Sequence, residues 1–178
     1  KRWAYAAPEE FGELVDILVE ATAEYLVGQV QAGARVIQLF DTWAGALHED
    51  ALARWCIEPT IELARRVKAA DPDVRVIAFS RGAATLYARY ARAPEIDGLG
   101  IDHTVERAWA KSELQPHCAV QGNLDPIALL AGGDHMRQQA EAILDSFSDG
   151  PFVFNLGHGI LPETPPDHVA HLIDIVRG

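Results

Sequence analysis

The sequence is poor in the features that mark several large classes of protein. It has only two cysteines among 178 residues, Cys56 and Cys118, and they form no CxxC pair. It has no apolar stretch near 18 residues, so no membrane span is predicted. Basic residues are in the minority, because 15 Lys and Arg stand against 26 Asp and Glu, a formal net charge of −11. Two buried free thiols in a reducing cytosol are expected, and a nucleic-acid or anionic-membrane partner is disfavoured.

Several catalytic and cofactor motifs are also missing. The chain has no GxGxxG and no Walker A lysine, and Gly157-His158-Gly159 is not a GxSxG elbow. His168 and His171 stand at i, i+3 without a third ligand beside them, so no metal site is predicted. Residues 1–5 are not followed by the apolar core of a signal peptide. The chain also starts without Met, which favours a piece cut from a longer protein.

Hydrophobic residues at 49% and charged residues at 23% are typical of a globular chain. Apolar periodicity and Pro/Gly punctuation predict alternating helices and strands. The strands are expected at 36–40, 74–79, 98–101, 118–121 and 152–155. The helices are expected at 8–31, 50–70, 82–93, 105–114, directly after 125–126, at 134–147 and from 164–167 to 175.

Strict alternation predicts an α/β fold with right-handed crossovers and a parallel sheet. Two closures fit this pattern. One is an open doubly wound sheet, and the other is part of a (β/α)8 barrel. Five strands in 178 residues are too few to close such a barrel alone.

Polar residues follow every predicted strand. The five strand ends read Asp41-Thr42-Trp43, Ser80-Arg81-Gly82, Asp102-His103, residues 122–125 (GNLD) and Gly157-His158-Gly159. Ligands of α/β proteins bind beyond the carboxyl ends of the strands. A polar pocket is therefore predicted at these five positions.

The individual residues at the strand ends have competing interpretations. Asp125 precedes a proline and is expected to be a helix N-cap, and Asp102 is expected to cap the helix after it. Arg81 is either half of a structural ion pair or a substrate contact. Thr42 is either a hydroxyl donor in the pocket or a helix cap. His158 lies between two glycines, which let a ligand approach the backbone, and a functional role is favoured.

Three segments carry a resemblance to a known family. They are residues 38–45 (QLFDTWAG), 121–126 (QGNLDP) and 154–162 (FNLGHGILP), the last followed by Thr164-Pro165-Pro166. In this order they closely resemble the uroporphyrinogen decarboxylase family. The similarity covers essentially the whole chain, but it matches only the C-terminal half of the family's usual chain.

The resemblance implies the C-terminal part of a (β/α)8 TIM barrel, with about five strands present, in a cytoplasmic homodimer. It also implies a carboxy-lyase that removes carbon dioxide from the four acetate arms of uroporphyrinogen III, giving coproporphyrinogen III for haem biosynthesis. The family needs no metal or organic cofactor, because a pyrrole ring protonated at carbon is its own electron sink. The enzyme then supplies positioning, a proton and charge stabilisation.

By the same resemblance, Thr42 matches the hydroxyl residue of the substrate pocket. His158 matches the histidine on the side of the substrate's carboxylates, and Arg81 matches a basic loop residue. No catalytic residue is assigned within the chain, because the family's arginine loop, central aspartate and pocket tyrosine would precede Lys1. Residues 1–178 are therefore expected to be a domain incomplete at its N-terminus and inactive alone.

Two rival functions stay open. A corrinoid-dependent methyltransferase of the same superfamily would bind zinc through His and Cys at the second strand's loop. That loop reads Phe79-Ser80-Arg81-Gly82 and holds neither residue type, so this rival is disfavoured. The other rival is a truncated, non-catalytic paralogue that serves as a binding or scaffold protein.

Overall fold

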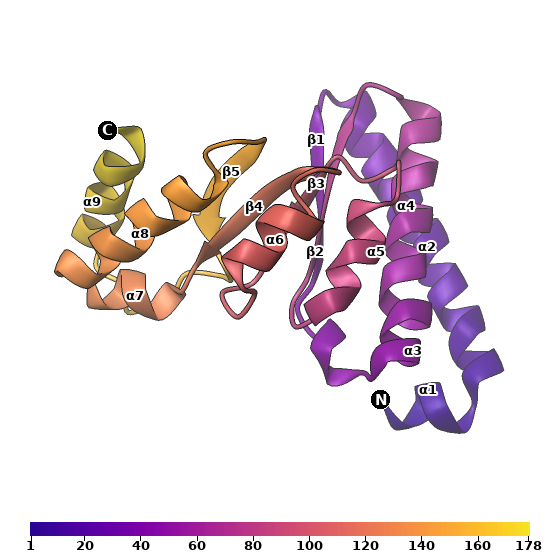
Figure 1. Ribbon diagram of the computed structural model, residues 1–178. Helices are drawn as coiled ribbons and strands as arrows, with labels where there is room; N and C mark the ends of the chain where they lie inside the picture. Colours follow the sequence, from indigo (N-terminus) through magenta and orange to yellow (C-terminus); the bar gives the residue numbers. More distant parts are fainter. The chain divides into compact units, whose positions relative to one another are not determined.

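The computed structural model describes residues 1–178 and shows five strands alternating with helices (Figure 1). The chain divides into two compact units, residues 1–99 and 100–178. The strand order is β1-β2-β3-β4-β5, with β3 (Gly98–Gly100) spanning the boundary between the units. No helix is both long and apolar enough to cross a membrane.

The first unit contains β1 and β2 together with five α-helices. In chain order these elements are α1 (Arg2–Ala6), α2 (Pro8–Gln31), β1 (Val36–Asp41), α3 (Glu49–Leu52), α4 (Glu58–Ala70), β2 (Arg75–Ser80) and α5 (Tyr87–Ala91). A π-helical turn, Ala53–Ile57, joins α3 to α4. Short 3-10 turns follow β1 at Ala44–Ala46 and β2 at Ala84–Leu86.

The second unit contains two longer strands and four helices. In chain order these are α6 (Arg107–Glu113), β4 (Ala119–Leu124), α7 (Pro126–Ala131), α8 (Gly133–Phe147), β5 (Phe152–Leu156) and α9 (Pro166–Arg177). Pro stands at the first helical position of α7 and α9, where its missing N–H costs nothing.

Parallel pairing with continuous register organises each unit. Val36 to Asp41 pair residue by residue with Arg75 to Ser80. Val120 to Leu124 pair in the same way with Phe152 to Leu156. The carboxyl ends of paired strands therefore lie side by side, and so do the loops that follow them.

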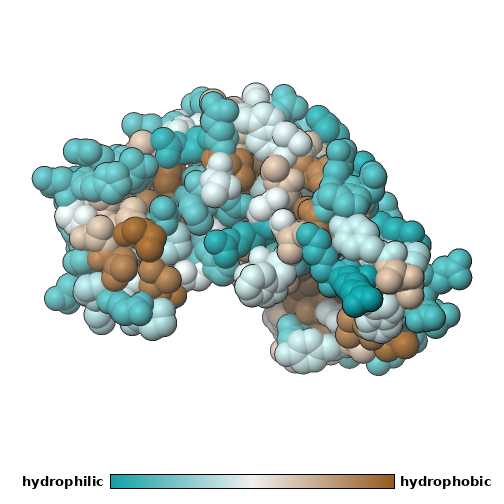
Figure 2. All heavy atoms as spheres, turned by 90° about the horizontal axis from the view of Figure 1, so that it is seen from below, coloured by the Kyte–Doolittle hydropathy of each residue, from teal (hydrophilic) through white to brown (hydrophobic).

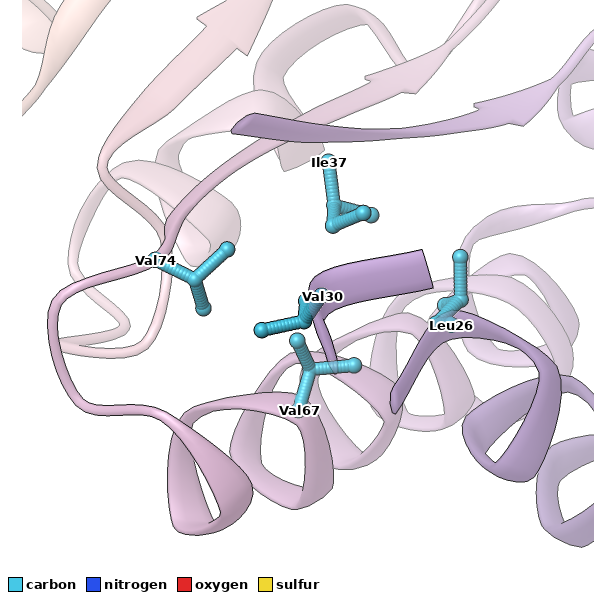
Figure 3. Packing of buried hydrophobic residues seen from close by; sticks show 5 residues of the cluster. All are labelled: Leu26, Val30, Ile37, Val67 and Val74. Carbon is cyan, nitrogen blue, oxygen red and sulfur yellow. The ribbon is translucent and has the colours of Figure 1, made fainter. Parts of the chain in front are cut away.

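The core of the first unit lies between α2, α4 and β1. Figure 3 shows Leu26, Val30, Ile37, Val67 and Val74 pointing toward one another from these elements and from the loop before β2. All five are at most 9% exposed. Burying a side chain of this size contributes about 1.5–3 kcal/mol relative to leaving it in water. This cluster fixes α2 and α4 on one face of the strands.

The core of the second unit is built on one face of α8. Met136, Ala140, Ile143 and Phe147 recur at helical spacing and are at most 1% exposed. Phe147 stacks on Phe152 of β5 with ring centroids 4.8 Å apart. The helix is therefore held against the strand that leads to His158.

The opposite sides of the outer strands carry apolar side chains that no helix covers. Val36 and Phe40 of β1 are 54% and 70% exposed, and Val153 of β5 is 47% exposed. Figure 2 shows one face of the molecule, on which hydrophobic side chains reach the surface between polar ones. Only one face of β1 is packed, because Ile37 and Leu39 point into the core while their neighbours do not.

The sequence predicted most elements but missed several boundaries. The helix α1 was not expected, and the helix expected over 82–93 is reduced to a 3-10 turn and α5. The strand expected to end at 121 continues to Leu124. Residues 164–167 (TPPD) resemble a capping box in the sequence, but that prediction is wrong, because the N-cap of α9 is Pro165 and no side chain caps the helix.

Both cysteines are buried free thiols, as predicted. Burial raises the pKa of Cys118 to about 11. Burial also raises the pKa of Cys56, and a hydrogen bond to Asp41 adds to this effect. Both thiols are therefore protonated at neutral pH and are poor nucleophiles.

One acidic side chain collects several donors at the amino end of β2. The Asp97 carboxylate accepts from Lys68 Nζ at 2.7 Å, from Arg75 Nη1 at 2.9 Å and from the Val76 N–H at 2.8 Å. Burial works against the charged form. The hydrogen bonds from Lys68, Val76 and Arg75 outweigh it and hold the pKa of Asp97 below its ordinary value.

We predict that Asp97→Asn lowers the free energy of unfolding by about 1–3 kcal/mol at pH 7, because the lysine loses its charged partner. Because the pKa of Asp97 is lower in the folded state, its carboxylate stabilises the protein at pH values above the unfolded-state pKa near 3.8. This contribution disappears as the pH falls through the folded pKa. Urea denaturation of both proteins from pH 7 into acid checks this, and a difference that did not shrink in acid would contradict it.

Candidate functional site

The structure brings Thr42 and Arg81 together at the carboxyl ends of β1 and β2. The register pairs Asp41 with Ser80, so the next residues of both strands face each other. The Arg81 N–H donates to the Asp41 carbonyl at 2.9 Å, and the Gly45 N–H donates to the Arg81 carbonyl at 2.9 Å. The loop after β1 is thus tied at both ends to the backbone of Arg81, with Thr42 between the ties.

Two glycines let these loops approach so closely. A Cβ on Gly45 would lie 3.0 Å from the Arg81 carbonyl oxygen and 3.1 Å from the Gly82 Cα. Gly82 itself has a φ of +76°, in the left-handed region that favours glycine. Both contacts involve backbone atoms, so a larger residue could not be accommodated by a side-chain movement.

Side chains beneath the strand ends brace the same loops. The Asp41 carboxylate accepts the Trp43 N–H at 3.2 Å and is hydrogen-bonded to the Cys56 thiol. The buried Ser80 hydroxyl lies 2.8 Å from the Tyr90 hydroxyl. Burial raises the pKa of Tyr90 to about 12, so this phenol stays neutral and bonded.

Exposed aromatic rings and an exposed guanidinium lie at this end of the first unit. Phe40 and Trp43 are 70% and 79% exposed and flank the half-buried Thr42. The Arg81 side chain is exposed and forms no ion pair anywhere in the chain. The structural ion pair considered from the sequence is therefore absent, and the guanidinium is available to an anion.

His158 lies at the carboxyl end of β5 in the second unit, and its ring is half-buried. The Gly159 N–H donates to its Nδ1. An imidazole nitrogen that accepts a hydrogen bond carries no proton, so we assign the proton to Nε2. In this tautomer Nε2 carries the proton, and this nitrogen is buried in the structure of residues 1–178.

The turn before His158 rests on the loop that follows β3. A Cβ on Gly157 would lie 2.3 Å from the His103 nitrogen, so only glycine fits at this position. The Gly157 N–H also donates to the Leu124 carbonyl at 2.7 Å. This histidine is therefore positioned by the loop that follows β3 and by the end of β4.

The expected helix caps have mixed outcomes. Asp125 caps α7 as predicted, accepting the Ile127 N–H at 2.8 Å. The cap predicted for Asp102 is wrong, since its carboxylate accepts the Thr104 N–H at 2.9 Å and Glu106 is the N-cap of α6. Thr42 caps no helix, because Trp43 precedes the next helical turn. This leaves the pocket-donor interpretation of Thr42.

A cavity of about 710 Å³ lies in the second unit between α6, α7 and α8. Its lining includes His103, Asn123 and His135 but not His158. This cavity thus opens among the helices of the unit and not at the predicted substrate residue. No group of three or more His, Cys, Asp or Glu side chains that could hold a metal ion occurs in residues 1–178.

Comparison with known proteins identifies the family. The uroporphyrinogen decarboxylase family model matches residues 1–178 in full. The chain belongs to the uroporphyrinogen decarboxylase family. Uroporphyrinogen decarboxylase of Rhodospirillum rubrum is 49% identical over 177 residues, which are 99% of this chain and 51% of that protein. The decarboxylase of Rhizorhabdus wittichii is 48% identical over 178 residues, which are 52% of its length.

The chain therefore spans about half the length of the curated relatives that it matches. A solved methyltransferase from Methanosarcina mazei superposes with a TM-score of 0.85 at 23% identity, covering 99% of this chain and 51% of that one. At this identity the likeness shows the fold alone. The predicted fold class, an α/β chain carrying five strands of a (β/α)8 barrel, is confirmed.

We predict that Gly45→Ala lowers the free energy of unfolding by about 1–3 kcal/mol, because its Cβ meets two backbone atoms that cannot rotate away. Gly28→Ala is the matched control. Gly28 lies in α2 with nothing within 4 Å of the added Cβ, and alanine should stabilise the helix by about 1 kcal/mol. Urea denaturation measures both, and equal shifts would contradict the close contact at Gly45.

Proposed function

We propose that this chain supplies one half of a uroporphyrinogen decarboxylase, in which it binds the substrate's carboxylates. The observation that carries the proposal is the placement of Thr42 and Arg81 side by side at the ends of β1 and β2, in a chain matched throughout by the family model. The exposed rings of Phe40 and Trp43 add an apolar surface beside them. Apolar rings next to unpaired donors suit a tetrapyrrole that carries carboxylate arms.

In the reaction, a pyrrole carbon is protonated and the ring then accepts the electron pair of the bond to the departing carboxylate. Carbon dioxide leaves, and a proton is added to the side-chain carbon that carried it. The proton first added to the ring carbon then departs, which restores the pyrrole. Within residues 1–178 the Thr42 hydroxyl, the Arg81 guanidinium and the His158 imidazole each contribute to binding substrate carboxylates. These contacts position the arm and screen its charge. The proton donor and the other cationic contacts come from the other half of the barrel.

The resemblance also implies a cytosolic homodimer, which remains a prediction. The non-catalytic binding or scaffold protein is the second candidate. The methyltransferase likeness adds no support for a third function, since at 23% identity it shows the fold alone, whereas the decarboxylases share 43–49%. One experiment separates the decarboxylase from the scaffold.

We predict that a chimera joining the N-terminal half of the Rhodospirillum rubrum decarboxylase to this chain converts uroporphyrinogen III to coproporphyrinogen III. The two proteins share 49% identity over the exchanged half, so the core contacts should be compatible. Chromatography of the oxidised porphyrins measures the conversion, with the N-terminal half alone as the control. A folded chimera without conversion would favour the scaffold.

We predict that His158→Ala in the active chimera lowers kcat/KM by about 10- to 100-fold, which matches the loss of one hydrogen bond to a charged group. Thr42→Val should lower it about tenfold, while Thr42→Ser, which keeps the hydroxyl, should not. His117→Ala changes an exposed histidine outside the strand ends and is the matched control. Unchanged turnover in His158→Ala with intact unfolding behaviour would remove His158 from the pocket.

A further inference from the structure

One buried side chain of the second unit is hydrogen-bonded on one side only. Asn123 lies on β4 and is 5% exposed. Its Nδ2 donates to the carbonyl oxygens of Asp102, at 3.3 Å, and Val105, at 3.0 Å. Its Oδ1 is buried and has no hydrogen-bond partner within the protein.

The orientation of this amide is fixed by its two acceptors. A half-turn of the group would point Oδ1 at two carbonyl oxygens and leave both without a donor. The observed orientation instead leaves one buried acceptor unsatisfied, which is costly in a protein interior. The two hydrogen bonds that Asn123 donates thus hold the loop in place, while its Oδ1 stays without a hydrogen bond.

That loop connects β3 to α6. It starts where the Ile101 N–H donates to the Gln121 carbonyl at 2.8 Å. Asp102 turns the chain by accepting the Thr104 N–H at 2.9 Å. The two bonds from Asn123 hold the loop before and after His103, so the backbone of His103 cannot move away from β4.

The same loop is the surface on which the turn before His158 rests. Gly157 is so close to the His103 backbone that an added Cβ would lie 2.3 Å from its nitrogen and 2.8 Å from its Cα. From the other side the Leu124 carbonyl accepts the Gly157 N–H at 2.7 Å. Leu124 is the residue directly after Asn123, so one strand end controls both contacts.

We propose that Asn123 is a positioning residue for His158. Its two hydrogen bonds hold the β3–α6 loop under Gly157, and this support sets the position of the His158 imidazole in the proposed site. The inference rests on the proposed role of His158 and assigns no direct substrate contact to Asn123. It explains why the QGNLDP segment combines a buried amide with the end of a strand.

The test is a double-mutant cycle in the active chimera. Asn123→Asp keeps the shape but replaces two N–H donors with an oxygen that repels the carbonyls of Asp102 and Val105. We expect Asn123→Asp to lower kcat/KM about 10- to 100-fold. Asn123→Ser keeps one donor, so its kcat/KM should lie between those of Asn123→Asp and the unaltered protein. In the His158→Ala background, Asn123→Asp should lower kcat/KM less than twofold, because the group it positions is already gone. Multiplicative losses would overturn the proposal.

Gln115→Glu is the matched control for a buried amide. Gln115 is 7% exposed, and its Nε2 donates to the Phe147 carbonyl at 3.0 Å, before the start of β4. Its replacement should lower stability as Asn123→Asp does and leave kcat/KM unchanged in both backgrounds. An equal loss of activity in Gln115→Glu would mean that any weakened core lowers turnover, and would overturn the proposal.

A second measurement separates this inference from the proposed function. Nitrogen-15 spectra of the imidazoles in the chimera report the tautomer of His158 without substrate. We expect a single tautomer with the proton on Nε2 in the unaltered protein and in Gln115→Glu, and an averaged signal in Asn123→Asp and Asn123→Ser. An unchanged His158 signal in both Asn123 variants would overturn the positioning role, whether or not the chimera decarboxylates uroporphyrinogen.

Discussion

Parallel pairing in register is the constraint on which the rest of the chemistry depends. It sets Thr42 beside Arg81 because Asp41 faces Ser80 one residue earlier, and it sets the turn before His158 against the end of β4. A shift of one residue would turn each strand's buried side chains to the opposite face. The buried clusters on α4 and α8 therefore stabilise the register as well as the core, and the strand ends follow from it.

Two glycines fix the positions of the loops that follow the paired strands. Gly45 and Gly157 are each placed where a Cβ would strike a neighbouring loop's backbone, at 3.0 Å and 2.3 Å. The turn with Gly45 rests on the loop after β2, and the turn with Gly157 rests on the loop after β3. Each turn holds a proposed substrate contact. The loops on each side are tied by backbone hydrogen bonds of 2.7–2.9 Å, so their geometry depends little on mobile side chains. Catalytic contacts need this rigidity, because small misplacements cost much of the rate.

Local patterns in the sequence were enough for the helix-strand alternation and for the Asp125 cap, since proline at N1 and a buried strand before it are local signals. They were not enough for the end of β4. Gly122 and Asn123 look like turn residues, yet the structure continues the strand through them. Gly122 lies against the Ile101 carbonyl and Asn123 donates to the loop beyond it. Both partners are some 20 residues away, so tertiary contacts overrode the local preference. The pair Thr42 and Arg81 was predictable, whereas the glycine contacts and the support from Asn123 were not.

The net charge of the chain and the charge of Arg81 at the proposed site differ in sign. A total of −11 argues against an anionic ligand, yet the repulsion between exposed negative charges is screened beyond about 10 Å. Part of the acidic surface is paired, as Glu62 is with Arg65 and Arg66, and Asp97 with Lys68. Arg81 is exposed at a strand end without an acid partner, so its field is not cancelled locally. A carboxylate that reaches this end meets the unpaired guanidinium at close range and the acidic surface only through screening water. The acidic surface and a carboxylate-binding site are therefore compatible in one chain.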